Sequence, residues 1–258
     1  MFVLDPSDVE REARNHGEEA EKLRVSSRVI LTFNQPVYQK LKEICGLKET
    51  EWSAAKYSPY CKPKKVFLGE YERSPIHVII PQMGASVITA LAEELIYFGA
   101  KVILLVCASW SLGAEYLAPG EIHVPSFAVG VDGTSSWYGK DSSKIDAPLS
   151  PINALRESLK KLDQSWKTGG VASHEAVYRI SKHDIEHFRS RGCLSMENGE
   201  AAALFSLGHQ KSIPLGVLLQ PYIDLIEGWS LDYIGELYAQ AGQNQAVAAL
   251  DALEKLEQ

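Results

Sequence analysis

The stretch HVIIPQMGASVITALAEELIYF, residues 77–98, decides the fold class of this chain. Its first part, His77–Pro81, is an apolar run of strand length. Its last part, Ser86–Phe98, repeats large apolar residues at helical spacing and is followed by Gly99 as a stop signal. Gly84 lies between the two parts, where a tight turn must join them. The stretch therefore predicts a strand, a glycine turn and a helix.

Strand-length apolar runs and helical patterns alternate outward from this unit. The runs are mostly continuous, which is typical of strands covered on both faces. We expect strands at Arg28–Phe33, Lys65–Leu68, Val102–Cys107, Ile122–Val129, Gly169–Ser173 and Leu215–Leu219. Helical patterns cover Lys182–Arg191, Glu200–Leu207 and Ser230–Glu257, the last one interrupted near Gly242. The alternation predicts an α/β fold with a largely parallel sheet between helices and with functional groups at the strand ends.

Length and pattern favour a single domain over residues 1–258, because the chain shows no internal repeat and no low-complexity linker. Residues 1–27 are expected to form an N-terminal extension and residues 230–258 a C-terminal helix. The longest stretch without a regular pattern, Asp132–Pro148, is rich in Gly, Ser and Asp. A loop of this length in a compact domain is usually functional or mobile.

Charge and cysteine content narrow the functional classes. The formal net charge of −7 argues against a nucleic-acid backbone or an anionic membrane as the main partner. No apolar run is long enough to span a bilayer and the first residues do not resemble a signal peptide, so we expect a cytoplasmic protein. Four widely spaced cysteines indicate reduced, buried thiols, and His183 and His187 lie on a polar helix with no third metal ligand in view.

Two of the predicted strands end in residues that could contact a ligand. The turn Gln82–Ser86 allows close backbone approach, and the free N–H groups of the following helix could meet an anion or a hydroxyl. The alternative, which this signal alone favours, is a purely structural glycine, because such turns need one anyway. Cys107–Ser111 follows the most apolar strand, and Ser109 and Ser111 could donate hydrogen bonds. Trp110 is either a platform for an aromatic ligand or a packed core residue. The serines lie in no GxSxG pattern, which argues against a hydrolase nucleophile.

Glu200 is the strongest single candidate for binding. It is followed by small apolar residues at the start of a buried helix, where a carboxylate is costly to desolvate without partners. One carboxylate can accept hydrogen bonds from both hydroxyls of a ribose diol. The alternative is that Glu200 only complements the helix N-terminus.

Six segments in order resemble the nucleoside phosphorylase superfamily, most closely its uridine phosphorylase-like branch. Residues 77–98 resemble the family's TGxGxPSxxIxxEEL, and the segment after Val102–Val106 corresponds to its RxGTxG. Residues 119–125 (PGEIHVP) resemble PGDIVIP, and residues 132–135 (DGTS) resemble DGTS or EGTS. Residues 170–178 (GVASHEAVY) resemble GVTASSDTFY, and residues 199–205 (GEAAALF) resemble MEsAALF.

This resemblance implies a three-layer αβα sandwich around a twisted, mixed, barrel-like sheet. It implies phosphorolysis of a purine or pyrimidine nucleoside in nucleotide salvage, with phosphate as co-substrate and no other cofactor. It also implies homo-oligomers, dimers or trimers of dimers, whose subunits complete each other's sites. By position, Glu200 would be the catalytic, ribose-holding carboxylate. The remaining substrate-binding candidates are Met83, Gly84, Cys107, Ala108, Ser109, Val177, Tyr178, Glu197 and Gly199, and those on the phosphate side are Asn34, Ser86 and Ser111.

The sequence departs from the family where the family binds phosphate. The arginine and threonine of RxGTxG correspond to Leu105 and Ala108, and Gly199 stands where the family has methionine. A dianion needs fixed positive charge, which Arg28, Arg73 or a neighbouring subunit would then have to supply. Two alternatives therefore stay open. One is a hydrolytic nucleosidase with Glu197 or Glu175 as general base, and the other is a non-catalytic homologue that binds a ligand or has a structural role.

Overall fold

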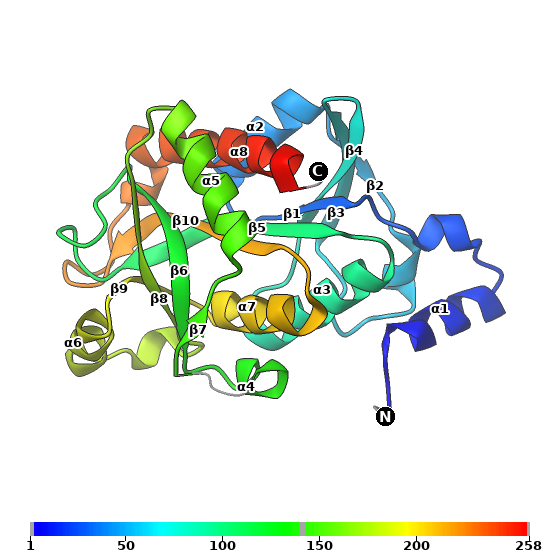
Figure 1. Ribbon diagram of the computed structural model, residues 1–258, viewed down its shortest axis with the longest axis horizontal. Coiled ribbons are helices and arrows are strands. Elements are labelled where there is room, and N and C mark those ends of the chain that lie inside the picture. The colour runs from blue at the N-terminus through cyan, green and yellow to red at the C-terminus, as the bar shows by residue number, and fades with distance from the viewer. Residues whose placement is uncertain (1–2, 140–142, 257–258) are drawn as a thin grey trace.

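The computed structural model describes residues 3–139 and 143–256. It contains a mixed sheet between two helical layers (Figure 1). The strands are β1 (Arg28–Leu31), β2 (Lys48–Thr50), β3 (Lys65–Tyr71), β4 (Ser74–Ile80), β5 (Val102–Ser111), β6 (Ile122–Gly130), β7 (Ile145–Asp146), β8 (Trp166–Ser173), β9 (Cys193–Glu197) and β10 (Leu215–Asp224). The α-helices are α1 (Pro6–Asn15), α2 (Gln35–Cys45), α3 (Ala85–Tyr97), α4 (Ser135–Tyr138), α5 (Leu149–Lys161), α6 (Lys182–Ser190), α7 (Glu200–Lys211) and α8 (Glu236–Leu256).

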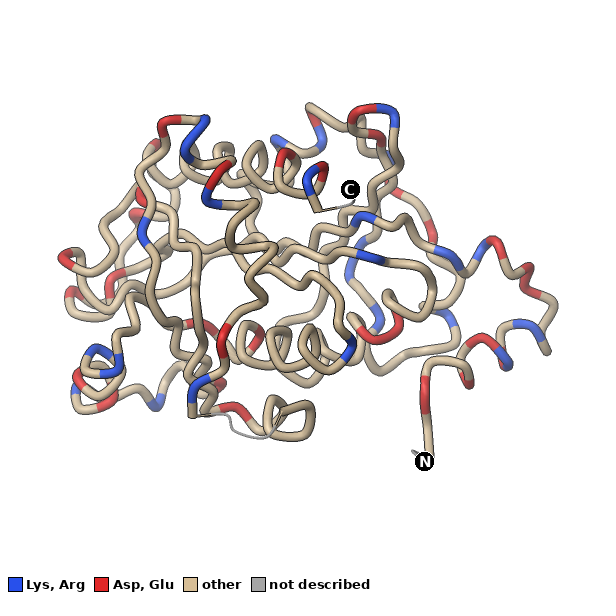
Figure 2. The backbone as a smooth tube through the Cα atoms, in the orientation of Figure 1, with Lys and Arg blue, Asp and Glu red and all other residues tan. Residues whose placement is uncertain are grey.

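The layers follow from the apolar faces of these helices. Helices α2, α5 and α8 cover one side of the sheet, and α3 and α7 cover the other (Figure 1). Short 3₁₀ turns, η1 (Ala20–Leu23), η2 (Ser53–Lys56), η3 (Val177–Arg179) and η4 (Asp232–Ile234), connect the main elements. Lys and Arg are interspersed with Asp and Glu along the chain rather than gathered on one face (Figure 2). The expected α/β sandwich is confirmed.

Part of the sheet closes on itself. Strands β5, β10, β6, β8 and β9 pair in sequence and β9 returns to β5, which makes a five-stranded barrel-like ring. β1, β4, β3 and β2 extend from β5 as an open edge. The expectation of a largely parallel sheet is wrong, because only half of the pairings among the described strands are parallel. The hairpin β3–β4 and the ring contacts β10–β6 and β5–β9 run antiparallel.

The C-terminal helix differs from its prediction in two respects. It begins at Glu236 rather than Ser230, since η4 precedes it, and it continues without interruption through Gly242. The absent side chain of Gly242 serves close packing: a Cβ there would lie 2.7 Å from Cβ of Pro36 at the start of α2. Glycine at this position therefore lets two helices approach and does not end one of them.

The predicted loop Asp132–Pro148 contains α4 and the short strand β7 within its described part, and residues 140–142 lie outside the described residues. All four cysteines are buried and unbridged, as expected. No helix in the described ranges is both long enough and apolar enough to cross a membrane. In the same ranges no group of three or more His, Cys, Asp or Glu side chains is arranged to hold a metal ion.

Candidate active site

A pocket of about 420 Å³ lies at the ends of several strands, where open α/β sheets usually bind ligands. We call it the strand-end pocket. Its walls come from the residues after β1, from the turn before α3, from β5, from the β9–α7 junction, and from β10 and α8. The lining residues are Phe33, Asn34, Met83, Cys107, Ala108, Ser109, Trp110, Val177, Tyr178, Glu197, Asn198, Glu200, Tyr222, Trp229 and Tyr238.

The side chain of Glu200 is held by the backbone of a distant turn. It is the first residue of α7 and is only 4% exposed. The backbone N–H of Gly84 donates to Oε1 of Glu200 at 2.8 Å. Gly84 has a φ of 113° as the N-cap of α3, a conformation that favours glycine. The starts of α3 and α7 thus meet at one carboxylate.

Glu197 lies beside Glu200 at the end of β9. Its Oε2 accepts the backbone N–H of Glu200 at 2.7 Å, and its Oε1 accepts the hydroxyl of Ser173. Ser173 is the register partner of Glu197 on β8, and its hydroxyl also accepts the N–H of Ala202 at 3.0 Å. Burial and the neighbouring Glu200 carboxylate raise the pKa of Glu197 well above its ordinary value. Glu197 is therefore a buried cap of α7 whose carboxyl group holds its proton to a higher pH than an exposed glutamate does.

Glu175, the other general base considered from the sequence, lies outside the pocket wall. It is exposed and accepts the backbone N–H of Gly133 at 3.2 Å. Gly133 belongs to the DGTS segment, where Oδ1 of Asp132 accepts the N–H groups of Thr134 and Ser135 at 2.8 and 2.7 Å. These bonds hold the turn before α4 in place. Glu175 therefore stabilises this turn and does not line the pocket.

The structure brings together nine of the residues singled out from the sequence for binding. The pocket wall contains Asn34, Met83, Cys107, Ala108, Ser109, Val177, Tyr178, Glu197 and Glu200. Met83 and Tyr178 are 58% and 90% exposed and form the mouth, whereas the two glutamates lie at the bottom. Burial raises the pKa of the Cys107 thiol well above its ordinary value, and the two carboxyl groups add to the shift. Cys107 is therefore a neutral thiol and not a nucleophile.

Four other site residues predicted from the sequence do not line the pocket. Gly84 sits behind Glu200, and Ser86 is exposed in the first turn of α3. Ser111 is buried, and its hydroxyl contacts the carbonyl oxygens of Gly113 and Leu117 at 2.9 and 2.8 Å. Ser111 therefore stabilises the loop after β5 and does not face the pocket.

Gly199, the fourth, is the N-cap of α7 with a φ of 96°. A Cβ there would lie 2.9 Å from Cγ of Glu175 and 3.0 Å from Cβ of Ala85. The close approach of α3 and α7 therefore leaves no room for a side chain at this position. This is the physical reason why glycine stands where the resemblance places methionine.

Asn34 closes the end of the pocket near α2. It is 3% exposed, and its Nδ2 donates to Oε1 of Gln245 at 3.4 Å, whereas its Oδ1 has no hydrogen-bond partner among the described residues. Asn34 is also the N-cap position of α2, an eleven-residue helix whose first turn receives no bond from a capping side chain. No capping side chain therefore satisfies the first N–H groups of α2, to which Pro36 contributes none.

Positive charge is absent from the pocket. None of the residues that line it in the described part of the chain is Lys, Arg or His. Arg28 is buried at the opposite end of β1, where its Nη2 donates to the carbonyl of Tyr71 at 2.9 Å, and Arg73 lies in the turn between β3 and β4. The position matched to the family's arginine, Leu105, is 1% exposed in the core.

Sequence reasoning missed most of the aromatic wall. Phe33, Trp229 and Tyr238 line the pocket together with Tyr222, Trp110 and Asn198. Tyr222 stacks on Tyr233 with ring centroids 4.3 Å apart, and Trp229 and Tyr238 meet it edge-on at 6.3 and 6.1 Å. The signal that could have found this wall is the density of aromatic residues between positions 222 and 238.

Comparisons with known proteins agree with this architecture. A purine nucleoside phosphorylase from Toxoplasma gondii, solved in complex with immucillin-H, superposes with a TM-score of 0.76 at 22% identity, over 91% of this chain and 93% of that one. A uridine phosphorylase from Vibrio fischeri superposes with a TM-score of 0.73 at 20% identity, over 92% and 94% of the two chains. No curated protein matches the chain in sequence. The model of the phosphorylase superfamily matches residues 13–253, and the chain belongs to that family.

Proposed function

We propose that the chain binds a nucleoside in the strand-end pocket and cleaves its N-glycosidic bond, with water as the acceptor. The observation that carries this proposal is the pair Glu197 and Glu200 at the bottom of a pocket that no Lys, Arg or His lines in the described part of the chain. A carboxylate with one oxygen fixed by Gly84 can accept hydrogen bonds from vicinal sugar hydroxyls. The aromatic side chains Tyr222, Trp229 and Tyr178 offer flat faces to a base.

The charges favour a neutral acceptor over phosphate. A dianion beside a buried carboxylate is repelled, and among the described residues no lining Lys, Arg or His offsets that repulsion. In the proposed reaction the bond from the anomeric carbon to the base nitrogen breaks, and a bond from that carbon to the water oxygen forms. The proton that water loses ends on the base, so that the products are ribose and free base.

Phosphorolysis, which the sequence ranks first, remains a second candidate because of one feature. The start of α2, whose first turn has no capping side chain, follows directly after Asn34 of the pocket wall and carries a favourable helix dipole. Neutral donors and a helix N-terminus can bind an anion without a formal charge. An arginine from a second subunit could complete such a site.

The test incubates the purified protein with adenosine, inosine, uridine and cytidine, with and without phosphate, and quantifies free base and sugar product by chromatography. Release of base with free ribose, unchanged by phosphate, is the expected result. If base is released only in the presence of phosphate, and ribose 1-phosphate forms with it, the acceptor is phosphate and not water. If the wild type releases no base from any of the four nucleosides, the proposed cleavage is refuted. Nucleoside binding would then be measured separately by calorimetry.

Assembly and location are proposed with the function. We propose a homo-oligomer, because Tyr178, Trp229 and Met83 leave large apolar surfaces exposed around the pocket mouth. Sedimentation at several protein concentrations tests it, and a monomer at all of them would refute it. We also propose a cytoplasmic location, on the grounds given by the sequence.

A further inference from the structure

The strand-end pocket is rich in aromatic side chains. Six of its fifteen lining residues are Phe, Trp or Tyr, whereas these types make up 9% of the sequence, so the wall is strongly enriched in rings. They are Phe33, Trp110, Tyr178, Tyr222, Trp229 and Tyr238. Tyr178 and Trp229 are 90% and 66% exposed, which leaves ring surface accessible to a ligand. The pocket can therefore cover a flat ring with aromatic faces.

The rings near the end of β10 support one another. Tyr233 stacks on Tyr222 with an interplanar angle of 17°. Trp229 and Tyr238 meet the ring of Tyr222 edge-on, at 77° and 75°. These contacts hold the rings in place without a ligand, which lowers the entropy that binding would cost.

The charge of the same wall has one sign. Glu197 and Glu200 line it, and no Lys, Arg or His does so in the described part of the chain. The face of an aromatic ring carries negative partial charge and attracts cations. The carboxyl groups and the ring faces thus act in the same direction. They favour a ligand with a positive charge over an uncharged ligand of the same shape.

A positive charge on the base also removes a chemical requirement. When an N-glycosidic bond breaks, its two electrons stay with the base nitrogen. An uncharged base therefore leaves as an anion unless an acid protonates it. A base that is a cation in the nucleoside leaves as a neutral molecule and needs no acid.

The buried acidic groups of the wall are poorly suited to supply a proton to the base. Both carboxyl oxygens of Glu197 are bound inside the protein, one to the hydroxyl of Ser173 and the other to the N–H of Glu200. Burial raises the pKa of the Cys107 thiol and of the Tyr238 phenol, which makes both groups weaker acids than they are in water.

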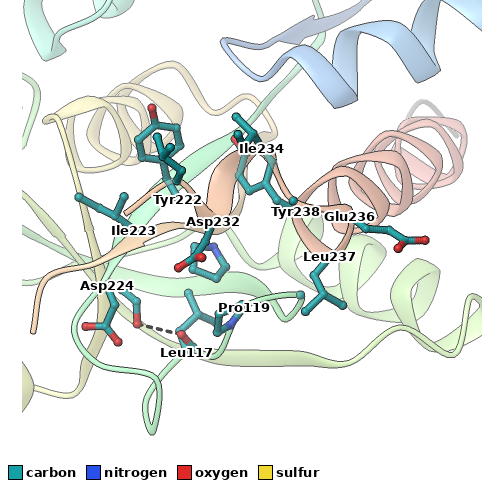
Figure 3. A pocket seen from close by; sticks show the side chains of 15 residues that line it. Leu117, Pro119, Tyr222, Ile223, Asp224, Asp232, Ile234, Glu236, Leu237 and Tyr238 are labelled. Carbon is teal, nitrogen blue, oxygen red and sulfur yellow. Dashed lines mark hydrogen bonds between the residues drawn. The ribbon is translucent and has the colours of Figure 1, made fainter. Parts of the chain in front are cut away.

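Asp224, the acidic residue at the end of β10, lies outside the pocket. It lines a separate cleft of about 460 Å³ between the loop after β5, the end of β10 and the start of α8 (Figure 3). Figure 3 shows the side chains of Tyr222 and Asp224 extending from β10 in different directions. Among the described residues, no Asp or His lines the strand-end pocket. A base in the pocket therefore meets the ring of Tyr222 and not the carboxyl group of Asp224.

We propose that the strand-end pocket prefers nucleosides whose base carries a fixed positive charge, such as a ribosylated pyridinium or an N-alkylated purine. This inference rests on the proposed function, because it names the substrate class of the same cleavage. The bond from the anomeric carbon to the base nitrogen breaks, and its electron pair neutralises the cationic base. The water oxygen bonds to the anomeric carbon, and the proton that water loses goes to solvent.

The first test measures binding with two carbocyclic ribosides. A CH₂ group replaces the ring oxygen in both, so that no oxocarbenium ion can form and neither probe is cleaved. One carries a 3-carbamoylpyridinium ring and the other the uncharged 3-carbamoylphenyl ring of the same shape. Isothermal titration calorimetry at low ionic strength compares them on the wild type, on the double variant Tyr178→Leu/Trp229→Leu and on the control Trp137→Leu. Trp137 is 84% exposed and does not line the pocket.

We expect the pyridinium probe to bind the wild type about tenfold more tightly than the phenyl probe. The double variant should lower this preference to about threefold or less, because it loses two ring faces. Trp137→Leu should keep the preference of the wild type. Equal affinities of the two probes in the wild type, or an unchanged preference in the double variant, would overturn the inference.

The second test measures cleavage with the intact sugar. The wild type is incubated without phosphate with 3-carbamoylpyridinium riboside and with uridine, and the released base is quantified after subtraction of the uncatalysed rate. We expect a higher kcat/KM for the pyridinium riboside, and an equal or lower value would also overturn the inference. Failure of the wild type to cleave either riboside would instead count against the proposed function.

Discussion

Gly84 donates its backbone N–H to Oε1 of Glu200 at 2.8 Å, although the two residues are 116 positions apart in the chain. The bond joins the starts of α3 and α7, and the backbone N–H of Glu200 in turn reaches Oε2 of Glu197 at 2.7 Å. Two buried carboxyl groups are thereby fixed at the bottom of one pocket.

The substitution Glu200→Gln should weaken nucleoside binding. The amide keeps the size of the side chain but loses charge-assisted hydrogen bonds worth about 1.5–3 kcal/mol, so the dissociation constant should rise roughly 10- to 150-fold. Calorimetry with the nucleoside that binds best measures it. Glu186→Gln on the exposed side of α6 is the matched control. Unchanged affinity in the Glu200 variant would show that this carboxylate does not hold the ribose.

Glu197→Gln should change how stability depends on pH. Because the folded state raises the pKa of Glu197, it retains a proton that the unfolded chain releases above its ordinary pKa of 4.5. The stabilisation from this group is complete below that pH and is lost as the pH rises towards the raised pKa. The free energy of unfolding of the variant, relative to the wild type, should therefore increase between about pH 5 and pH 8.

Urea denaturation at several pH values measures this difference. The pKa of Glu94 is also raised by burial, but Glu94 is present in both proteins and its contribution cancels. A difference that stays constant across the range would mean that Glu197 is ionised in the folded protein.

Gly199→Ala should destabilise the protein by about 1–3 kcal/mol, since the position has a φ of 96° and a Cβ would contact Ala85 and Glu175. Gly133→Ala is the matched control, because a Cβ there would meet no atom within 4 Å. We expect the control to stay within about 0.5 kcal/mol of the wild type in urea unfolding. Equal effects of the two substitutions would argue against a close contact between α3 and α7.

Leu105→Arg should destabilise the fold rather than restore a phosphate site. Leu105 is 1% exposed, and its register partners are Leu31 on β1 and Val217 on β10. An unpaired charge at this position should cost about 3 kcal/mol or more, which lowers the melting temperature by roughly 6–12 °C. Leu68→Arg, at a position that is 40% exposed on β3, should have little effect. A stable Leu105→Arg protein with new affinity for phosphate would contradict this prediction.

Each of the seven strands predicted from the sequence is present in the structure, because continuous apolar runs such as Val102–Cys107 depend only on local composition. It also located α3, α6 and α7. It missed α2 and α5, whose first turns contain Pro36 and Pro151. In a sequence, a proline close to a strand or a loop is easily taken for a loop residue. The first turn of a helix nevertheless accommodates proline, because the N–H groups of that turn have no partner within the helix.

Short β9 also escaped prediction. It carries Ser195 and Glu197 among apolar residues, and both polar side chains are buried. Their burial is stable only because β9 places Glu197 beside Ser173 on β8, and Ser195 within 2.9 Å of Nδ1 of His123. A local pattern cannot indicate such partners.

For the site, the sequence by itself singled out Glu200 and most of the residues at the strand ends as candidates, since a carboxylate at the start of an apolar helix stands out locally. Only the tertiary structure decided that Glu197 lies next to it with a raised pKa, and that no basic side chain of the described residues lines the pocket. The physical reason is that pKa values and cavity walls depend on distances between segments far apart in the chain. Those distances are set by the closing of the five-stranded ring and by the packing of α8 against α2.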